Sequence, residues 1–326
     1  MPQKSRAEGP RILASDEPGI KTVLMNAADP FPLTHQPSRL IGRLCVVGAA
    51  VLWSSSGFFA KHPIFDAWDD GIRGTLLAFW RALFAALILL PTIRRPRWRL
   101  GLVPLGACFV VMSISYLTAM SNTTAANAIW LQGTCPWWVF LGSVVLLREP
   151  IVPRDLIPLA FGVLGVGTIL FYEVQGQALF GSVCGLVAGI SYAGVVIAMR
   201  RLRAENSSWL VALNHGVAVL VLLPGVLYLA QGPSWQQLGM LAGFGVFQMA
   251  IPYLLLIRGL RAISAQEAVA IGMLEPILIP FWAFLVRGEV PEPWTIVGAS
   301  LIFVGLMLRY VLCELWIQGR AGGSDQ

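Results

Sequence analysis

The sequence predicts an all-α integral membrane protein with ten transmembrane helices, arranged as two inverted five-helix repeats. The composition is the first support, because 56% of the 326 residues are hydrophobic and only 12% are charged. A soluble domain carries about 25% charged residues. A second support is a duplicated pattern at residues 123–149 and 263–289. Each copy has a polar start, then about twenty apolar residues with a central proline, which is enough to cross a bilayer, and a closing glutamate.

The two copies align at one fixed offset, which matches Pro136 with Pro276 and Glu149 with Glu289. Duplicated apolar spans that contain a proline are typical of transporters built from repeats. Each expected unit has an odd number of spans, so the second unit enters the membrane from the opposite side. Such halves are related by a pseudo-two-fold axis in the membrane plane, and a binding site between them can open alternately to either side.

Residues 1–40 are polar and proline-rich and contain no apolar signal-peptide core, so we expect a disordered cytoplasmic tail. The two units follow at 41–173 and 178–312, and a cytoplasmic tail at 313–326 ends the chain. Short connections favour antiparallel neighbours in one bundle. The ten expected spans cover residues 41–61, 74–92, 100–120, 124–147, 155–173, 178–199, 208–228, 235–257, 264–286 and 293–312.

The repeat also supports the spans outside the duplicated pattern. In the first span, Trp53 and Lys61 match Tyr192 and Arg200 of the sixth. The second and seventh spans match at two pairs of positions, Arg81 with Asn214 and Pro91 with Pro224. The fifth and tenth match at Gly165 and Gly305.

Basic residues predict the orientation. Of the 23 Lys and Arg residues, only Lys61, Arg73 and Arg287 lie outside if the N-terminus is inside, and Arg81 lies within a span. All others fall on the inner side. The positive-inside rule therefore places both termini in the cytoplasm, and we expect a multi-pass protein of the cell inner (plasma) membrane.

The same sequence argues against several other functions. The five cysteines and three histidines form no metal-binding or disulfide pattern, and we expect no metal, cofactor or catalytic residues. Only His215 lies within a span, so an intramembrane enzyme is a distant alternative. The basic residues lie in the connections between spans, so the net positive charge does not indicate nucleic-acid binding. No phosphate-binding P-loop motif is present, and no ring of charges or carbonyls suggests a channel.

Polar and aromatic residues within spans are candidates for contact with a small amphipathic ligand. In the fourth span, Asn127, Trp130 and Thr134 share one face of a continuous helix. The alternatives are helix packing and an aromatic belt at the membrane interface. Thr124 and Asn127 have the spacing of a capping box, like Ser264 and Glu267, so capping is also an open role for Asn127. The candidate substrate-binding residues are Trp53, Ser56, Tyr116, Asn127, Trp130, Thr134, Tyr192, Gln248, Tyr253 and Glu275.

Two charged residues within spans are costly and call for an explanation. Arg81 could anchor a carboxylate of the substrate, form an ion pair with Glu275, or extend to the outer interface. Glu275 precedes Pro276, whose missing N–H leaves a carbonyl free. It could contact substrate, couple transport to protons, or stabilise the kink in the helix.

An ordered set of short motifs covers residues 41–312. They are Trp53–Lys61, Arg81-Ala82-Leu83, Ala125–Ala128, Pro136, Arg148-Glu149, Leu274-Glu275-Pro276 and Gly288-Glu289. Together they resemble the drug/metabolite transporter superfamily, EamA type, although Arg148 stands where that family often has glycine. The resemblance implies ten helices, a central cavity and transport of amino acids or other small metabolites without ATP.

The expected function is therefore a secondary active transporter of a small organic metabolite, an amino acid or related compound, with export as the favoured direction. An importer of a vitamin, sugar or nucleotide-type metabolite on the same scaffold is the alternative. The expected partners are the metabolite and the lipid bilayer, and the protein is expected to be a monomer or homodimer. The substrate, the coupling ion and the direction of net flux stay open.

Overall fold

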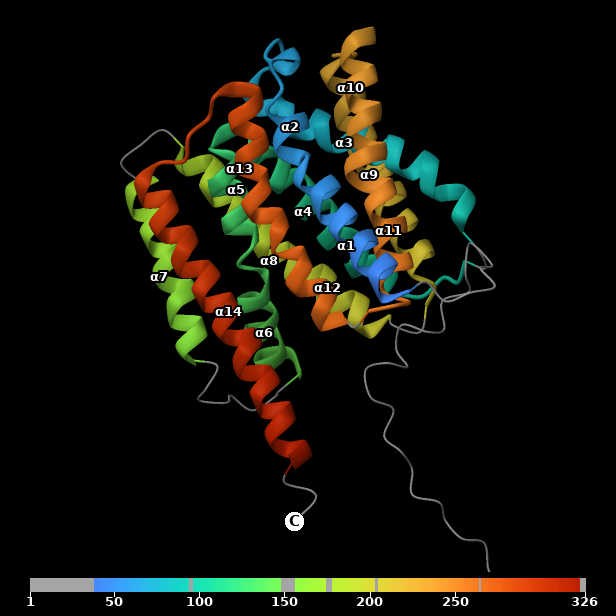
Figure 1. The fold of residues 1–326 in the computed structure, drawn as a ribbon. Helices are drawn as coiled ribbons and strands as arrows, with labels where there is room; N and C mark the ends of the chain where they lie inside the picture. Colours follow the sequence, from blue (N-terminus) through green and yellow to red (C-terminus); the bar gives the residue numbers. More distant parts are fainter. Residues whose placement is uncertain are drawn as a thin grey trace, which may run out of the picture.

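The computed structural model describes residues 38–93, 96–147, 156–173, 178–202, 205–263 and 265–322. Within these ranges all regular structure is helical (Figure 1). The predicted tail 1–40 lies outside the described residues apart from 38–40. Arg148, Glu149 and Ser264 also lie outside them.

Seven helical stretches in the described part of the chain are long and apolar enough to cross a membrane, and all seven coincide with expected spans. They are α1 with α2 (Arg39–Ser54 and Ser56–Ala60), α3 (Asp70–Leu89, extended by a 3₁₀ turn at Leu90–Thr92), α4 (Leu102–Asn122), α7 (Leu156–Glu173), α8 (Leu179–Arg201), α9 (Ser207–Leu229), and α10 with α11 (Trp235–Gly245 and Ile251–Gly259).

The other expected spans, 124–147, 264–286 and 293–312, are helical but differ from a single long apolar helix. The first two are each divided, into α5 (Ala125–Gln132) with α6 (Cys135–Leu147) and α12 (Ala265–Gly272) with α13 (Leu274–Arg287). The third is α14 (Pro293–Gly322), in which the stretch Pro293–Leu308 is apolar. Helix α14 continues past residue 312, the expected end of the span, to Gly322, and no proline follows Pro293 in the sequence to end it.

The two divided spans break at corresponding positions of the repeat. Helices α5 and α6 meet at Gly133 and Thr134, and α12 and α13 meet at Met273. Proline has no N–H, so Pro136 and Pro276 each leave the carbonyl four residues earlier without its helical donor. At the first break the Thr134 N–H turns to the Leu131 carbonyl at 3.3 Å, which tightens the chain. The central prolines thus accompany short interruptions of the helical hydrogen bonding, at which Gly133 and Met273 keep right-handed helical dihedral angles.

The helices before and after residues 174–177 pack against each other in reciprocal pairs. Helix α4 packs on α8, and α1 packs on α11. In addition, α3 contacts α9, α5 contacts α13, and α7 contacts α14. The α7–α14 pair lies side by side at one edge of the bundle (Figure 1). The pairs α3–α9, α5–α13 and α7–α14 each join corresponding spans of the two expected units. The pairs α4–α8 and α1–α11 are reciprocal, since one joins the third span to the sixth and the other joins the first span to the eighth.

The α7–α14 contact depends on two glycines. A Cβ atom on Gly165 would lie 2.6 Å from the Gly298 carbonyl oxygen, and one on Gly298 would lie 2.8 Å from the Gly165 oxygen. Neither position has room for a side chain, because the obstacle is backbone on both sides. The close approach brings the two helix backbones into direct contact.

We expect Gly165→Ala to lower the unfolding temperature in detergent, because the added methyl group forces α7 and α14 apart at a cost of about 1–3 kcal/mol. Gly167→Ala is the matched control on the same helix, since nothing lies within 4 Å of a Cβ there. It should be neutral or stabilising, as alanine favours helix over glycine. Equal unfolding temperatures for the two variants would contradict the packing argument.

Candidate functional site

Arg81 is the most deeply placed charge in the described bundle. It lies on α3 with 2% of its surface exposed, which excludes an extension to the interface. Its Nη2 donates to Ser113 Oγ at 2.8 Å and its Nη1 to Gln248 Oε1 at 3.4 Å. The guanidinium carbon lies 5.3 Å from the centre of the Phe244 ring. Among the described residues, these acceptors are neutral and no carboxylate pairs with Arg81.

Gln248 reaches Arg81 because the backbone of its span widens there. Residues Val246–Ala250 form a π-helical turn, in which the Ile251 N–H bonds to the Val246 carbonyl. Pro252 follows and cannot donate to the Gln248 carbonyl. Such π-helical turns often occur at functional sites. The Gln248 amide also donates to the Trp53 carbonyl at 3.2 Å, so it links α1 to the arginine on α3.

Two tyrosines lie beside this arginine. Tyr116 and Ser56 share a hydrogen bond of 2.9 Å, and Tyr253 packs edge-on against Trp53 with ring centres 5.3 Å apart. The charge of Arg81 is within electrostatic range of both tyrosine hydroxyls. The structure therefore gathers a group of buried polar and aromatic side chains, here called the polar core, in which hydrogen bonds link Ser113, Arg81 and Gln248, and separately Ser56 and Tyr116, and a ring contact adds Tyr253. Its members are Trp53, Ser56, Arg81, Ser113, Tyr116, Gln248 and Tyr253.

Glu275 lies close to the polar core but is not hydrogen-bonded into it. It is half-buried in the first turn of α13, directly after the break at Met273. Its charge is also within electrostatic range of Tyr116 and Tyr253. No ion pair joins it to Arg81 or to another described residue. The free N–H groups at a helix start favour a negative charge, so this carboxyl group has a local reason to lie there.

Asn127 belongs to a different buried network. Its Nδ2 donates to Glu173 Oε1 at 2.6 Å and to Thr123 Oγ1 at 3.2 Å, and its Oδ1 accepts from Thr295 at 2.8 Å. Its backbone N–H donates to Thr124 Oγ1 at 3.1 Å, so Thr124 caps α5, whereas the Asn127 side chain makes no capping bond among the described residues. The Asn127 side chain thus ties α5 to α7 and α14. The sequence analysis did not predict Glu173 as the partner of Asn127. The position of this carboxylate at the end of an apolar span could have indicated that it needs a buried partner.

Three other candidates lie outside the polar core. Trp130 packs edge-on against Phe303 of α14 at 6.2 Å. Thr134 donates to the Leu131 carbonyl at 2.6 Å and accepts from the Trp138 indole at 3.0 Å. Tyr192 is 42% exposed on α8. The site residues expected from sequence are therefore divided, and five of the ten join Arg81 in the polar core.

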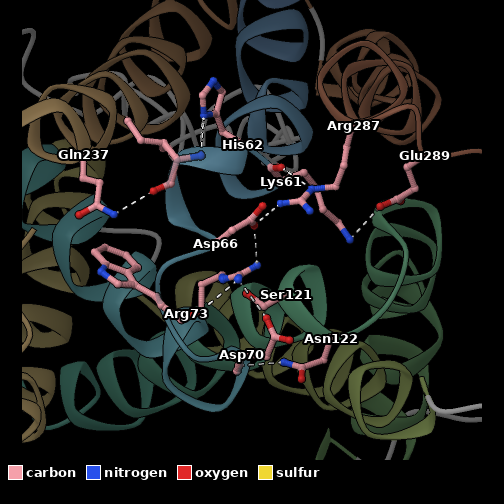
Figure 2. Close-up of polar contacts among 12 residues, drawn as sticks. Lys61, His62, Asp66, Asp70, Arg73, Ser121, Asn122, Gln237, Arg287 and Glu289 are labelled. Atoms are coloured by element: carbon pink, nitrogen blue, oxygen red, sulfur yellow. Dashed lines mark hydrogen bonds and ion pairs between the residues drawn. The ribbon is translucent and has the colours of Figure 1, made fainter. Parts of the chain in front are cut away.

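A cluster of charged side chains lies where the segment after α2 meets the ends of α4 and α13 (Figure 2). Lys61 Nζ lies 2.8 Å from Glu289 Oε2 and donates to the Thr123 carbonyl at 2.6 Å. The other Glu289 oxygen accepts from the Ala125 N–H at the start of α5. Both side chains of this ion pair are largely buried, at 11% and 15% exposed. Burial lowers the pKa of Lys61 below its usual 10.5, and the Glu289 carboxylate opposes that shift.

Asp66 joins two arginines in the same region (Figure 2). Arg287 pairs with Asp66 and donates from Nε to the Lys61 carbonyl at 2.9 Å. Arg73 lies 3.5 Å from Asp66 and 3.1 Å from Asp70. We call Lys61, Asp66, Asp70, Arg73, Arg287 and Glu289 the ion cluster. The sequence placed Lys61, Arg73 and Arg287 on one side of the membrane but did not foresee their acidic partners.

Comparison with known proteins adds evidence beyond this geometry. The model of the EamA-like transporter family matches residues 40–171 and again residues 179–311. A solved crystal structure of a protein matches 84% of this chain and 99% of its own with a TM-score of 0.55, at 17% identity. That likeness supports the fold alone.

Proteins with similar sequences are described as transporters. An uncharacterised transporter of Archaeoglobus fulgidus is 27% identical over 82% of this chain and 96% of its own. The Pseudopaline exporter CntI of Pseudomonas aeruginosa is 28% identical over 61% of this chain and 70% of its own. The uncharacterised transporter YxxF of Bacillus subtilis is 24% identical over 91% and 97%. The resemblance to EamA-type transporters is thereby confirmed.

We expect Lys61→Met to destabilise the protein, because Glu289 then keeps its largely buried charge without a counter-ion. Replacing both residues, as Lys61→Met with Glu289→Gln, should restore stability, since no buried charge is then left without a partner. A double-mutant cycle of unfolding temperatures measures the coupling, which should be about 1–3 kcal/mol. Additive effects of the two single variants would show that the pair contributes nothing.

Proposed function

This chain belongs to the EamA-like transporter family, and from that premise we propose that it is a secondary active transporter of a small organic metabolite. The protein is a multi-pass membrane protein, and the proposed location is the cell inner membrane with both termini in the cytoplasm. The observation that carries the substrate proposal is Arg81, a buried cation without a carboxylate partner among the described residues.

We propose ten spans in two inverted units, 41–173 and 178–312. Two observations support this arrangement. The breaks before Pro136 and Pro276 fall at corresponding positions of the repeat. The contacts of α4 with α8 and of α1 with α11 are reciprocal. Divided helices at matching positions of two halves are the usual pointer to the substrate site of such transporters.

The proposed substrate carries a carboxylate that binds Arg81. A guanidinium has five N–H donors, and the described residues accept only two bonds from it, so donors are left for an anion. The rings of Trp53, Tyr116 and Tyr253 supply apolar faces around that anchor. Glu275, near the same tyrosines, is proposed either to receive an amino group or to exchange a proton. Asn127, Trp130 and Thr134, whose contacts lie outside the polar core, are proposed to have structural roles instead.

Alternating access is the proposed mechanism, and the ion cluster is proposed as the closed gate of one side. It ties Lys61, Asp66 and Arg73 of the first unit to Arg287 and Glu289 of the second. In the proposed orientation this side faces outward. The similarity to an exporter supports export as the direction of net flux.

The first test is a metabolite survey of cells and medium with and without the protein. Expression should raise one or more carboxylates in the medium, and Arg81→Met should reduce that export about ten- to hundredfold, the value of a charged hydrogen bond. Arg258→Met, which alters an exposed arginine at the end of α11, is the control. Unchanged export by a folded Arg81→Met protein would overturn the assignment of this anchor.

The second test concerns Glu275. In proteoliposomes loaded with a metabolite found by the survey, an imposed pH gradient should drive transport by the wild type. Glu275→Gln should lose this response while it still exchanges substrate at equilibrium, because the amide cannot release a proton. Glu292→Gln, an exposed residue before α14, should behave as the wild type. Wild-type transport that ignores the gradient would eliminate proton coupling.

A further inference from the structure

His215 on α9 is buried without any hydrogen bond. Its side chain is 1% exposed, and neither Nδ1 nor Nε2 has a partner among the described residues. Most buried polar side-chain atoms in proteins are hydrogen-bonded, and each exception needs an explanation. The described helices leave this imidazole with two unmet positions, so the missing partner must be something other than these residues.

The imidazole lies beside the polar core. Its ring centre is 5.0 Å from that of Phe109 on α4 and 6.3 Å from that of Tyr253 on α11. Phe109 stands one helical turn from Ser113, which binds Arg81. The charge of Arg81 is within electrostatic range of His215. A molecule bound at Arg81 and Tyr253 therefore has His215 as a neighbour.

The chemistry of the imidazole specifies what would fit there. In its neutral form it offers one N–H donor and one nitrogen acceptor. A hydroxyl or an amide can satisfy such a group, whereas an alkyl chain leaves it unbonded. A site built to hydrogen-bond a polar group discriminates strongly against the analogue that lacks it, because its own buried atoms are then left unpaired.

We propose that His215 is a specificity-determining residue, which hydrogen-bonds an uncharged polar group on a substrate whose carboxylate binds Arg81. This inference rests on the proposed function. It narrows the substrate class from carboxylates in general to carboxylates with a hydroxyl or amide within reach of both residues. An ordered water on His215 is the competing explanation, and it would make His215 important for stability but not for selectivity.

The test compares His215→Leu, which removes both nitrogens, with His215→Gln, which keeps a donor and an acceptor. Proteoliposome exchange is measured with matched probes, serine against alanine and glutamine against leucine. The wild type and His215→Gln should prefer the polar member of each pair. His215→Leu should lose that preference by about ten- to hundredfold with little change for the apolar member. Equal losses for both members, or an unchanged preference, would overturn the proposal.

A second measurement needs no substrate. With the five native cysteines replaced, a hydrophilic thiol reagent should label His215→Cys and Gln248→Cys in membrane vesicles. Leu213→Cys is the matched control, because Leu213 lies on α9 within an apolar cluster. Labelling at 248 without labelling at 215 would overturn the role of His215 and leave the proposed function intact. Labelling at neither position would count against the polar core as a transport site, and so against both.

Discussion

The guanidinium of Arg81 takes a full charge and five donors into the apolar interior of the bundle, and the neighbouring helices are arranged around it. Inside a bilayer no water is available to satisfy such a group, so the protein itself must do so. Ser113 of α4 and Gln248 of the π-helical turn each accept one hydrogen bond. The Phe244 ring approaches the same cation. One buried charge thus connects α3 to α4 and to the α10–α11 span, and Gln248 extends the connection to α1.

Prolines place the irregular backbone that this arrangement needs. Pro136, Pro252 and Pro276 each withhold a helical hydrogen bond, and each coincides with a departure from regular α-helix. Non-helical backbone at membrane depth is tolerated only where protein or a water-filled cavity surrounds it. The departure near Pro252 allows Gln248 to face Arg81, and the break before Pro276 places Glu275 at a helix start. The backbone irregularities therefore position polar side chains within the bundle.

The sequence predicted this region in part, and the failures have a physical reason. Gln248 was found because a polar side chain within an apolar span is costly, and Trp53 and Tyr116 because an aromatic ring with a hydrogen-bond donor suits a small amphipathic ligand. Asn127 and Thr134 were placed on one face by assuming a continuous helix, but the helix is interrupted at Gly133 and Thr134, between α5 and α6. Their hydrogen bonds then go to Glu173 and to the Leu131 carbonyl, which no periodicity argument can foresee.

Tyr192 shows a different limit of sequence reasoning. It was a candidate as an aromatic residue within a span, and it matches Trp53 in the repeat, yet Trp53 packs on Tyr253 whereas Tyr192 is 42% exposed. A duplicated chain can place matching residues in unlike surroundings, because the two copies have diverged in the residues that face them. Arg81 and Asn214, which also match in the repeat, have diverged as well, since the first is charged and the second is neutral. Repeats therefore predict backbone arrangement better than they predict side-chain roles.

The ion cluster bears on how the proposed gate can open at low cost. Asp66 is shared between Arg287 of the second unit and Arg73 of its own, so separation of the units leaves Asp66 with a counter-ion. Lys61 and Glu289 lose their coupling of about 1–3 kcal/mol on opening, but water would then reach both charges and offset part of that loss. A gate made of such pairs can close one side without making that state much more stable than the other. Alternating access requires states of similar free energy, between which a bound substrate can shift the population. The ion cluster and Arg81 thus have opposite energetic roles in this proposal: the charges of the ion cluster can exchange partners for water on opening, whereas Arg81 stays buried and is proposed to keep the substrate site fixed.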